Sequence, residues 1–141
     1  MVSEPAPGGG FRVHGIPIPQ GSMRGFIHRS KEGKAHVALT SANTKTEPWR
    51  QDVAAQAIAA KVPHIALGPV RLHVTFFLPR PKSRAKKHKW PDVRPDLDKL
   101  LRAILDSLTG IAFRDDAQVC EVYAEKVYTG PIGALISVEA L

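Results

Sequence analysis

Apolar and polar residues alternate over residues 68–79, and this period of two is the clearest structural pattern in the chain. Val70 and Leu72 would face one side of a strand, while Arg71 and His73 would face the other. His73 could be read as a metal ligand, but a half-exposed strand residue is the more ordinary interpretation. Shorter patterns predict an edge strand over 11–19, a strand and turn within 20–34 with Glu32-Gly33 as the turn, and strands over 36–39, 117–128 and 134–141.

Two segments have a helical period instead. The first opens at 44–47 and ends before Pro63, and its apolar face should pack on a sheet. Either Thr44 or Thr46 could cap the free amides at its start. The apolar face consists of Trp49, Val53, Ala57 and Ala60.

The second predicted helix covers residues 96–108. Six large aliphatic residues recur along it at i, i+3, i+4, i+7, i+8 and i+11, and Gly110 is placed to stop it. Such a stripe suits either a core face or a subunit interface. The stripe consists of Leu97, Leu100, Leu101, Ile104, Leu105 and Leu108.

These elements predict an α/β (α+β) chain in which two main helices pack on one mixed sheet. The chain has 141 residues and a hydrophobic content of 43%, which suggests one domain over 11–141 after a loose tail at 1–10. Its single cysteine, Cys120, cannot form an internal disulfide or a cysteine zinc site, and we expect it to be a small buried hydrophobe on its strand. The sequence lacks a signal pattern and a membrane-spanning run, so a cytoplasmic location is expected.

The formal net charge is +7, which favours a polyanionic partner, with nucleic acid before an anionic membrane surface. The most basic segment, 80–94, has neither a helical nor a strand period. It could be a solvated loop that only improves solubility. We favour a phosphate-binding loop, because it leads directly into a group of carboxylates. Its candidate DNA-binding residues are Arg80, Lys82, Arg84, Lys86, Lys87, Lys89, Arg94 and Trp90, the last able to stack on a base.

The carboxylates form two pairs, Asp96 with Asp98 and Asp115 with Asp116. Clustered acids repel one another unless a cation neutralises them, and Mg²⁺ prefers hard oxygen ligands. On a regular helix Asp96 and Asp98 would point about 200° apart, but at the start of a helix both can converge. The second pair reaches the same point only if the strand that follows runs back beside the helix, and we expect this arrangement.

Structural alternatives exist for each acid. Asp96 could simply cap the helix. Asp98 with Arg102, and Arg102 with Asp106, could form i,i+4 ion pairs. The pair at 115–116 could be a turn.

The spacing of the acids resembles the RusA family of Holliday junction resolvases, endonucleases common in phages and prophages. The resemblance is close over about a fifth of the chain. The matching residues are Arg94, Asp96, Leu97, Asp98 and Leu100, then Asp106 and Leu108, then Asp115, Asp116, Ala117, Gln118 and Val119.

The resemblance implies a homodimer that uses Mg²⁺, with Mn²⁺ expected to substitute, to cut two opposed strands of a four-way junction in DNA recombination and repair. It implies that Asp96, Asp98 and Asp116 are the catalytic acids that bind metal, with Asp115 a weaker candidate. The family also uses a lysine one helical turn after the second acid, and in this chain that position is Arg102.

Three hypotheses therefore stand. In the first, the chain is a junction-cutting nuclease in which Arg102 or Lys99 stabilises the charge on the phosphate. In the second, motivated by the missing lysine, it binds branched DNA without cutting. In the third, the chain is a structural domain in which the acids only cap a helix and form a turn.

Overall fold

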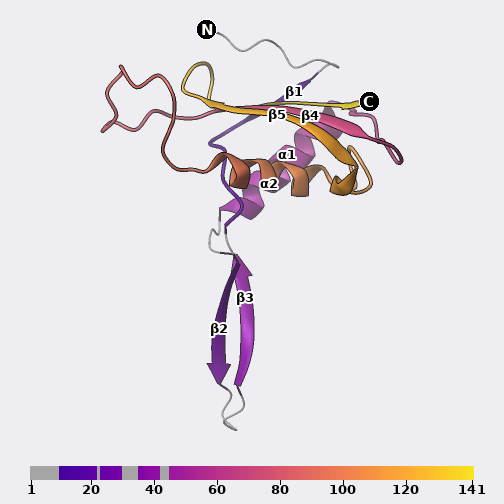
Figure 1. Cartoon of the computed structure of the whole chain (residues 1–141), viewed down its shortest axis with the longest axis horizontal. Helices are drawn as coiled ribbons and strands as arrows, with labels where there is room; N and C mark the ends of the chain where they lie inside the picture. The colour runs from indigo at the N-terminus through magenta and orange to yellow at the C-terminus, as the bar shows by residue number, and fades with distance from the viewer. Residues whose placement is uncertain (1–9, 22, 30–34, 42–44) are drawn as a thin grey trace.

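The computed structural model describes residues 10–21, 23–29, 35–41 and 45–141. Four strands form a mixed sheet in the order β1-β6-β4-β5, and both helices lie on one of its faces (Figure 1). This α+β arrangement is the predicted one. In chain order the elements are β1 (Phe11–His14), β2 (Met23–Arg29), β3 (Ala35–Ser41), α1 (Thr46–Ala59), β4 (Val70–Phe77), α2 (Leu97–Leu108), the 3-10 turn η1 (Asp116–Gln118), β5 (Val119–Val127) and β6 (Gly133–Ala140).

Strand β4 is the strand that the alternating pattern predicted at 68–79. It pairs antiparallel with β6 and parallel with β5, so it is an inner strand of the sheet. Val70 and Leu72 are fully buried on its helix-facing side. His73 is half-buried on the other side, where its ring lies beside that of Tyr123, tilted by 42° at a centroid distance of 5.6 Å. The interpretation of His73 as an ordinary strand residue agrees with this position.

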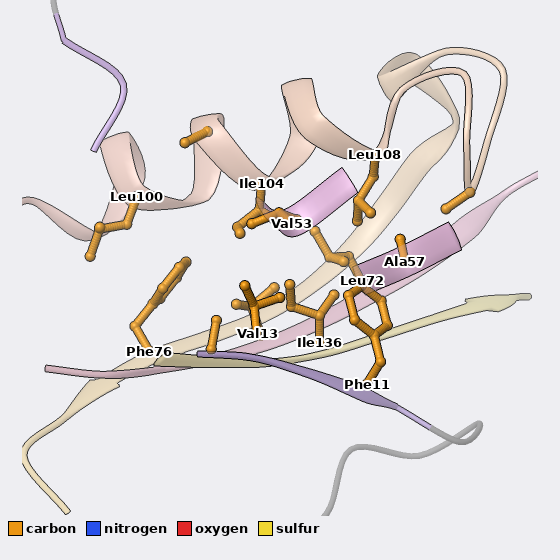
Figure 2. Packing of buried hydrophobic residues seen from close by; sticks show 14 of the residues in the cluster. Phe11, Val13, Val53, Ala57, Leu72, Phe76, Leu100, Ile104, Leu108 and Ile136 are labelled. Atoms are coloured by element: carbon orange, nitrogen blue, oxygen red, sulfur yellow. The ribbon is translucent and has the colours of Figure 1, made fainter. Parts of the chain in front are cut away.

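The core lies between the sheet and the two helices (Figure 2). Leu100, Ile104 and Leu108 of α2 are fully buried in it, so this part of the aliphatic stripe is a core face. Each such side chain contributes roughly 1.5–3 kcal/mol by leaving water. The remaining three leucines of the stripe are only partly buried and pack at the border of the core.

The start of α1 differs from the prediction. Its N-cap residue is Lys45, which makes no side-chain capping bond, and the hydroxyl of Thr46 instead donates to the carbonyl oxygen of Pro19 at 2.8 Å. Thr46 therefore ties α1 to the segment after β1, while Thr44 lies outside the described residues. Ala60 is exposed because the helix ends at Ala59, one residue earlier than its apolar pattern suggested.

The expectation that Cys120 is buried is wrong. Strand β5 is an edge strand, paired only with β4, and its first half lacks cover on both faces. Cys120 is exposed, and so are Val122 and Tyr123, at 41% and 71%. Alternation correctly separates the two faces of such a strand, but it cannot show whether anything covers them.

Strands β2 and β3 pair antiparallel in a separate two-stranded sheet that stands away from the four-stranded one (Figure 1). They confirm the strands expected within 20–34 and at 36–39. The turn predicted at Glu32-Gly33 lies outside the described residues, as do residues 1–9 of the expected tail. In the described part of the chain, no helix has the length and apolar character needed to cross a bilayer.

Candidate active site

Two carboxylates at the start of α2 have almost no structural role. Asp96 is the N-cap residue, with an extended backbone (ψ 137°), yet its side chain makes no capping hydrogen bond. Its one ion pair within the described residues is with the ammonium of Lys99, at 3.6 Å. Asp98 is exposed in the first helical turn. The capping alternative is therefore wrong for Asp96, and both carboxylates lie at the positive end of the helix dipole.

Arg102 lies one helical turn after Asp98 and is exposed. Neither of the alternative ion pairs, with Asp98 or with Asp106, is among those formed by the described residues. The guanidinium of Arg102 is therefore not engaged with a carboxylate of its own helix. Such a group can bind a phosphate with two parallel hydrogen bonds.

A lysine that the sequence interpretation missed holds this acidic segment in place. Lys126 of β5 pairs with Phe76 of β4 and so belongs to the helix-facing side of the sheet. Its ammonium donates to the carbonyl oxygens of Val93 at 3.0 Å and Pro95 at 2.9 Å. These are backbone groups just before Asp96. A signal did exist in the sequence, because Lys126 is a charged residue at an inward position of an alternating strand.

The second acidic pair lies in a hydrogen-bonded turn. The carboxylate of Asp115 accepts from the amide of Ala117 at 2.9 Å, and Asp115 and Gln118 form a capping box. The side-chain oxygen of Gln118 accepts from the amides of Arg114 and Asp115, both at 2.9 Å. The turn alternative is therefore correct for Asp115.

Gln118 also joins this turn to a distant part of the chain. Its side-chain amide donates to the carbonyl oxygens of Ile65 at 2.9 Å and Gly68 at 3.1 Å. The glutamine of the sequence motif thus has a structural role. The side chain of Asp116, by contrast, is exposed and makes no hydrogen bond or ion pair among the described residues. Of the second pair, Asp116 is the carboxylate that remains available.

The two acidic pairs lie at opposite ends of α2 (Figure 1). Twelve helical residues span about 18 Å at 1.5 Å per residue. No three His, Cys, Asp or Glu side chains in the described part of the chain are placed to hold one metal ion. The expectation that Asp116 returns to the first turn of the helix is therefore wrong. Strand β5 does run back beside α2, but it brings Lys126 to that point.

The basic loop at 80–94 forms no helix or strand, and two of its arginines maintain its shape. Arg80 donates to two carbonyl groups of the loop, and its guanidinium lies 4.5 Å from the centre of the Tyr128 ring. Arg84 forms an ion pair with Asp92. Both arginines are half-buried and already have partners, which makes them weaker candidates for phosphate binding than the sequence suggested.

The other cations of this loop are exposed, and none forms an ion pair with a described carboxylate. Trp90 is 60% exposed among them. The exposed cations are Lys82, Lys86, Lys87, Lys89 and Arg94. They form a positively charged surface that leads towards Asp96, as a chain that binds a polyanion requires.

The sequence model of the family Endodeoxyribonuclease RusA matches residues 17–139. The chain belongs to the RusA family. It is 32% identical over 129 residues to the uncharacterized protein YqaN of Bacillus subtilis (strain 168), covering 84% of this chain and 87% of YqaN. It is 37% identical over 60 residues to the crossover junction endodeoxyribonuclease rusA of Lactococcus phage r1t, covering 42% of this chain and 45% of that protein.

Membership of the RusA family confirms the resemblance drawn from the acidic motif. It indicates a nuclease that resolves Holliday junctions and therefore a branched DNA substrate. The hypothesis of a purely structural domain is thereby excluded.

Proposed function

We propose that this RusA-family chain cuts four-way DNA junctions in a metal-dependent reaction, as a homodimer that nicks two opposed strands. One observation carries the proposal. Two carboxylates, Asp96 and Asp98, are exposed at the start of α2, and neither makes a capping hydrogen bond. They directly follow the basic loop. The ion pair of Asp96 with Lys99 leaves Asp98 without a cationic partner among the described residues, and clustered acids of this kind favour a bound cation.

The donor set fits a hard divalent cation. Mg²⁺ usually binds through one or two carboxylates, together with waters and phosphate oxygens of the substrate. Asp96 and Asp98 would supply the carboxylates, with Mn²⁺ able to replace Mg²⁺. When bound, the cation supplies Lewis-acid activation of the phosphate and of the attacking water. The chain itself contributes Lys99, which pairs with Asp96, and Arg102, whose guanidinium would stabilise charge on the phosphate.

A homodimer would complete the acidic site. Because Asp116 lies at the far end of α2 from Asp98, it can join that site only from a second copy that runs antiparallel along the same helix. The edge strand β5 supports such a contact, since its side chains Val122 and Tyr123 are large and exposed, one on each face of the sheet. Each site would then combine Asp96 and Asp98 of one subunit with Asp116 of the other.

The basic loop would bind the DNA backbone, with the exposed lysines contacting phosphates and Trp90 available for stacking. Junction preference would come from DNA shape and from the spacing of the two sites, because contacts to phosphates carry no sequence information.

The first experiment incubates the chain with a synthetic four-way junction and with a matched duplex, in Mg²⁺, in Mn²⁺ or in EDTA. We expect paired nicks in the junction with either metal, none in EDTA, and an uncut duplex. Tight junction binding without products in either metal would instead identify a branched-DNA-binding protein without nuclease activity.

A second experiment tests whether the site is shared between subunits. Asp98→Asn and Asp116→Asn are each expected to abolish cutting. A purified heterodimer of the two variants would retain one intact site if the acids come from different subunits, and should nick one strand. If each site belonged to one chain, both sites of the heterodimer would be defective and no nick would appear. Normal cutting by Asp116→Asn alone would remove Asp116 from the site.

A further inference from the structure

A cavity of about 210 Å³ lies beside the acidic segment, where both ends of the basic loop meet the chain leaving β1 and β5. Leu78 and Tyr128 form part of its wall, Arg94 and Pro95 lie on the side that leads to Asp96, and Ile16 stands at its opening, 56% exposed. The cavity is smaller than a pocket for a drug-sized ligand, which occupies roughly 300–1,000 Å³. It therefore suits a single compact ring system.

The walls of this cavity are rigid. Five of its lining residues are prolines, whose φ angles are fixed by their rings. The ammonium of Lys126 donates hydrogen bonds to the carbonyl groups of Val93 and Pro95, and the guanidinium of Arg80 packs on the ring of Tyr128. A cavity with so little freedom to collapse is already formed before a ligand arrives, so binding costs little conformational entropy.

The surroundings of the cavity specify the chemistry of its occupant. Most of the lining is apolar, which favours a flat, weakly hydrated body. Arg94 in the wall and the exposed lysines of the loop favour an attached negative charge. A nucleobase on its phosphate backbone has both properties.

We propose that this cavity receives one unstacked nucleobase from the DNA strand that is cut. Since Pro95 is in the wall and Asp96 follows it directly, a base held there places its own backbone next to the two carboxylates. In an intact duplex the base must first be unpaired and unstacked, whereas a base at a branch point is released more easily. The cavity thus makes the nuclease selective for branched DNA. This inference rests on the proposed function.

The test fills the cavity opening and measures binding in EDTA, where no cutting occurs. Ile16→Trp adds bulk at the opening on an exposed residue. Leu67→Trp is the matched control, because Leu67 is 80% exposed and does not line the cavity. We expect Ile16→Trp to weaken four-way junction binding by about tenfold, the scale of one base-stacking contact, and to leave duplex binding unchanged. Leu67→Trp should match the wild type for both DNAs.

Junctions with single abasic nucleotides near the branch point provide the second measurement. At one position, loss of the base should weaken binding of the wild type about tenfold and have no further effect on Ile16→Trp, because both changes remove the same contact. Ile16→Phe, a smaller addition at the same exposed residue, should reduce junction binding in the same direction and serves if Ile16→Trp does not fold.

Equal junction binding by the wild type and the cavity variants, with no abasic position that distinguishes them, would overturn the proposal. The result is independent of cutting. If the wild type never cuts in Mg²⁺ but binds abasic junctions more weakly, the proposed nuclease activity is refuted and the proposed base-binding cavity is supported.

Discussion

The two ends of α2 carry similar acidic pairs in very different surroundings. At the first end, Asp96 and Asp98 are exposed, and the backbone that presents them is fixed from behind by Lys126. At the second end, Asp115 is occupied by a capping bond and Gln118 binds the turn to distant carbonyl groups. The two acidic pairs look equivalent in the sequence but differ in the structure. Both acids of the first pair are available for chemistry, whereas in the second pair Asp115 maintains the turn.

The largest expected effect concerns the first end. Asp98→Asn should reduce junction cleavage by about 100-fold or more, as removal of a single electrostatic catalytic group does. Stability should change by less than about 0.5 kcal/mol, because Asp98 is an exposed surface residue. DNA binding should be kept or strengthened, since a negative charge is removed. Single-turnover cleavage, junction binding and thermal unfolding measure the three quantities.

Asp52→Asn is the matched control, because Asp52 is an exposed acid on the other helix. It should leave cleavage, binding and stability unchanged. An Asp98→Asn variant that cuts at the wild-type rate would show that the first end of α2 is not the active one.

At the second end, the expected effect is on folding. Gln118→Ala removes four hydrogen bonds and should lower the free energy of unfolding by about 2–4 kcal/mol. Urea denaturation measures this loss, and Gln56→Ala, an exposed glutamine of α1, is the control with no expected change. If Gln118→Ala were as stable as the wild type, the turn would not depend on the Gln118 side chain. The second end of α2 would then lack the structural role that distinguishes it from the first.

The sequence predicted those features that depend on one element at a time. The alternation of β4 and the aliphatic stripe of α2 are each repeated several times within a single segment. The predicted alternation of burial holds in the first half of β4, whereas the second half is buried on both faces, and three of the six residues of the stripe are fully buried. The acidic motif was also visible, because its residues are close in the chain. The exposure of Cys120 was missed because β5 is an edge strand whose first half is uncovered on both faces, and a pattern within one strand does not show this.

The wrong expectation for Asp116 has a related cause. Its position depends on the direction in which the chain leaves α2, and neither helical nor strand periodicity encodes that direction. Lys126 was missed because its partners, the carbonyl groups of Val93 and Pro95, are about thirty residues away and belong to the backbone, which a sequence pattern does not display.

A smaller effect is expected for Lys126. Lys126→Met removes both bonds to the segment before Asp96 and should reduce cleavage about tenfold, the lower end of the range for groups that orient metal ligands. The loss should appear as a higher Mg²⁺ concentration needed for half-maximal rate, and Lys126→Arg should recover part of it. A purely structural role would instead lower the melting temperature and leave the Mg²⁺ dependence unchanged.

The smallest expected effect separates the exposed cations of the basic loop from the arginines that hold its shape. Replacing Lys86 and Lys87 together by Gln should weaken junction binding a few-fold at moderate salt. It should also reduce the slope of log K against log salt by roughly 2, since each phosphate contact contributes about 0.9. Arg84→Gln should change this slope by less than about 0.9, the share of one phosphate contact, because the guanidinium of Arg84 is already paired with Asp92. A full change of about 0.9 for Arg84→Gln would mean that DNA displaces this ion pair, and that the loop rearranges when it binds.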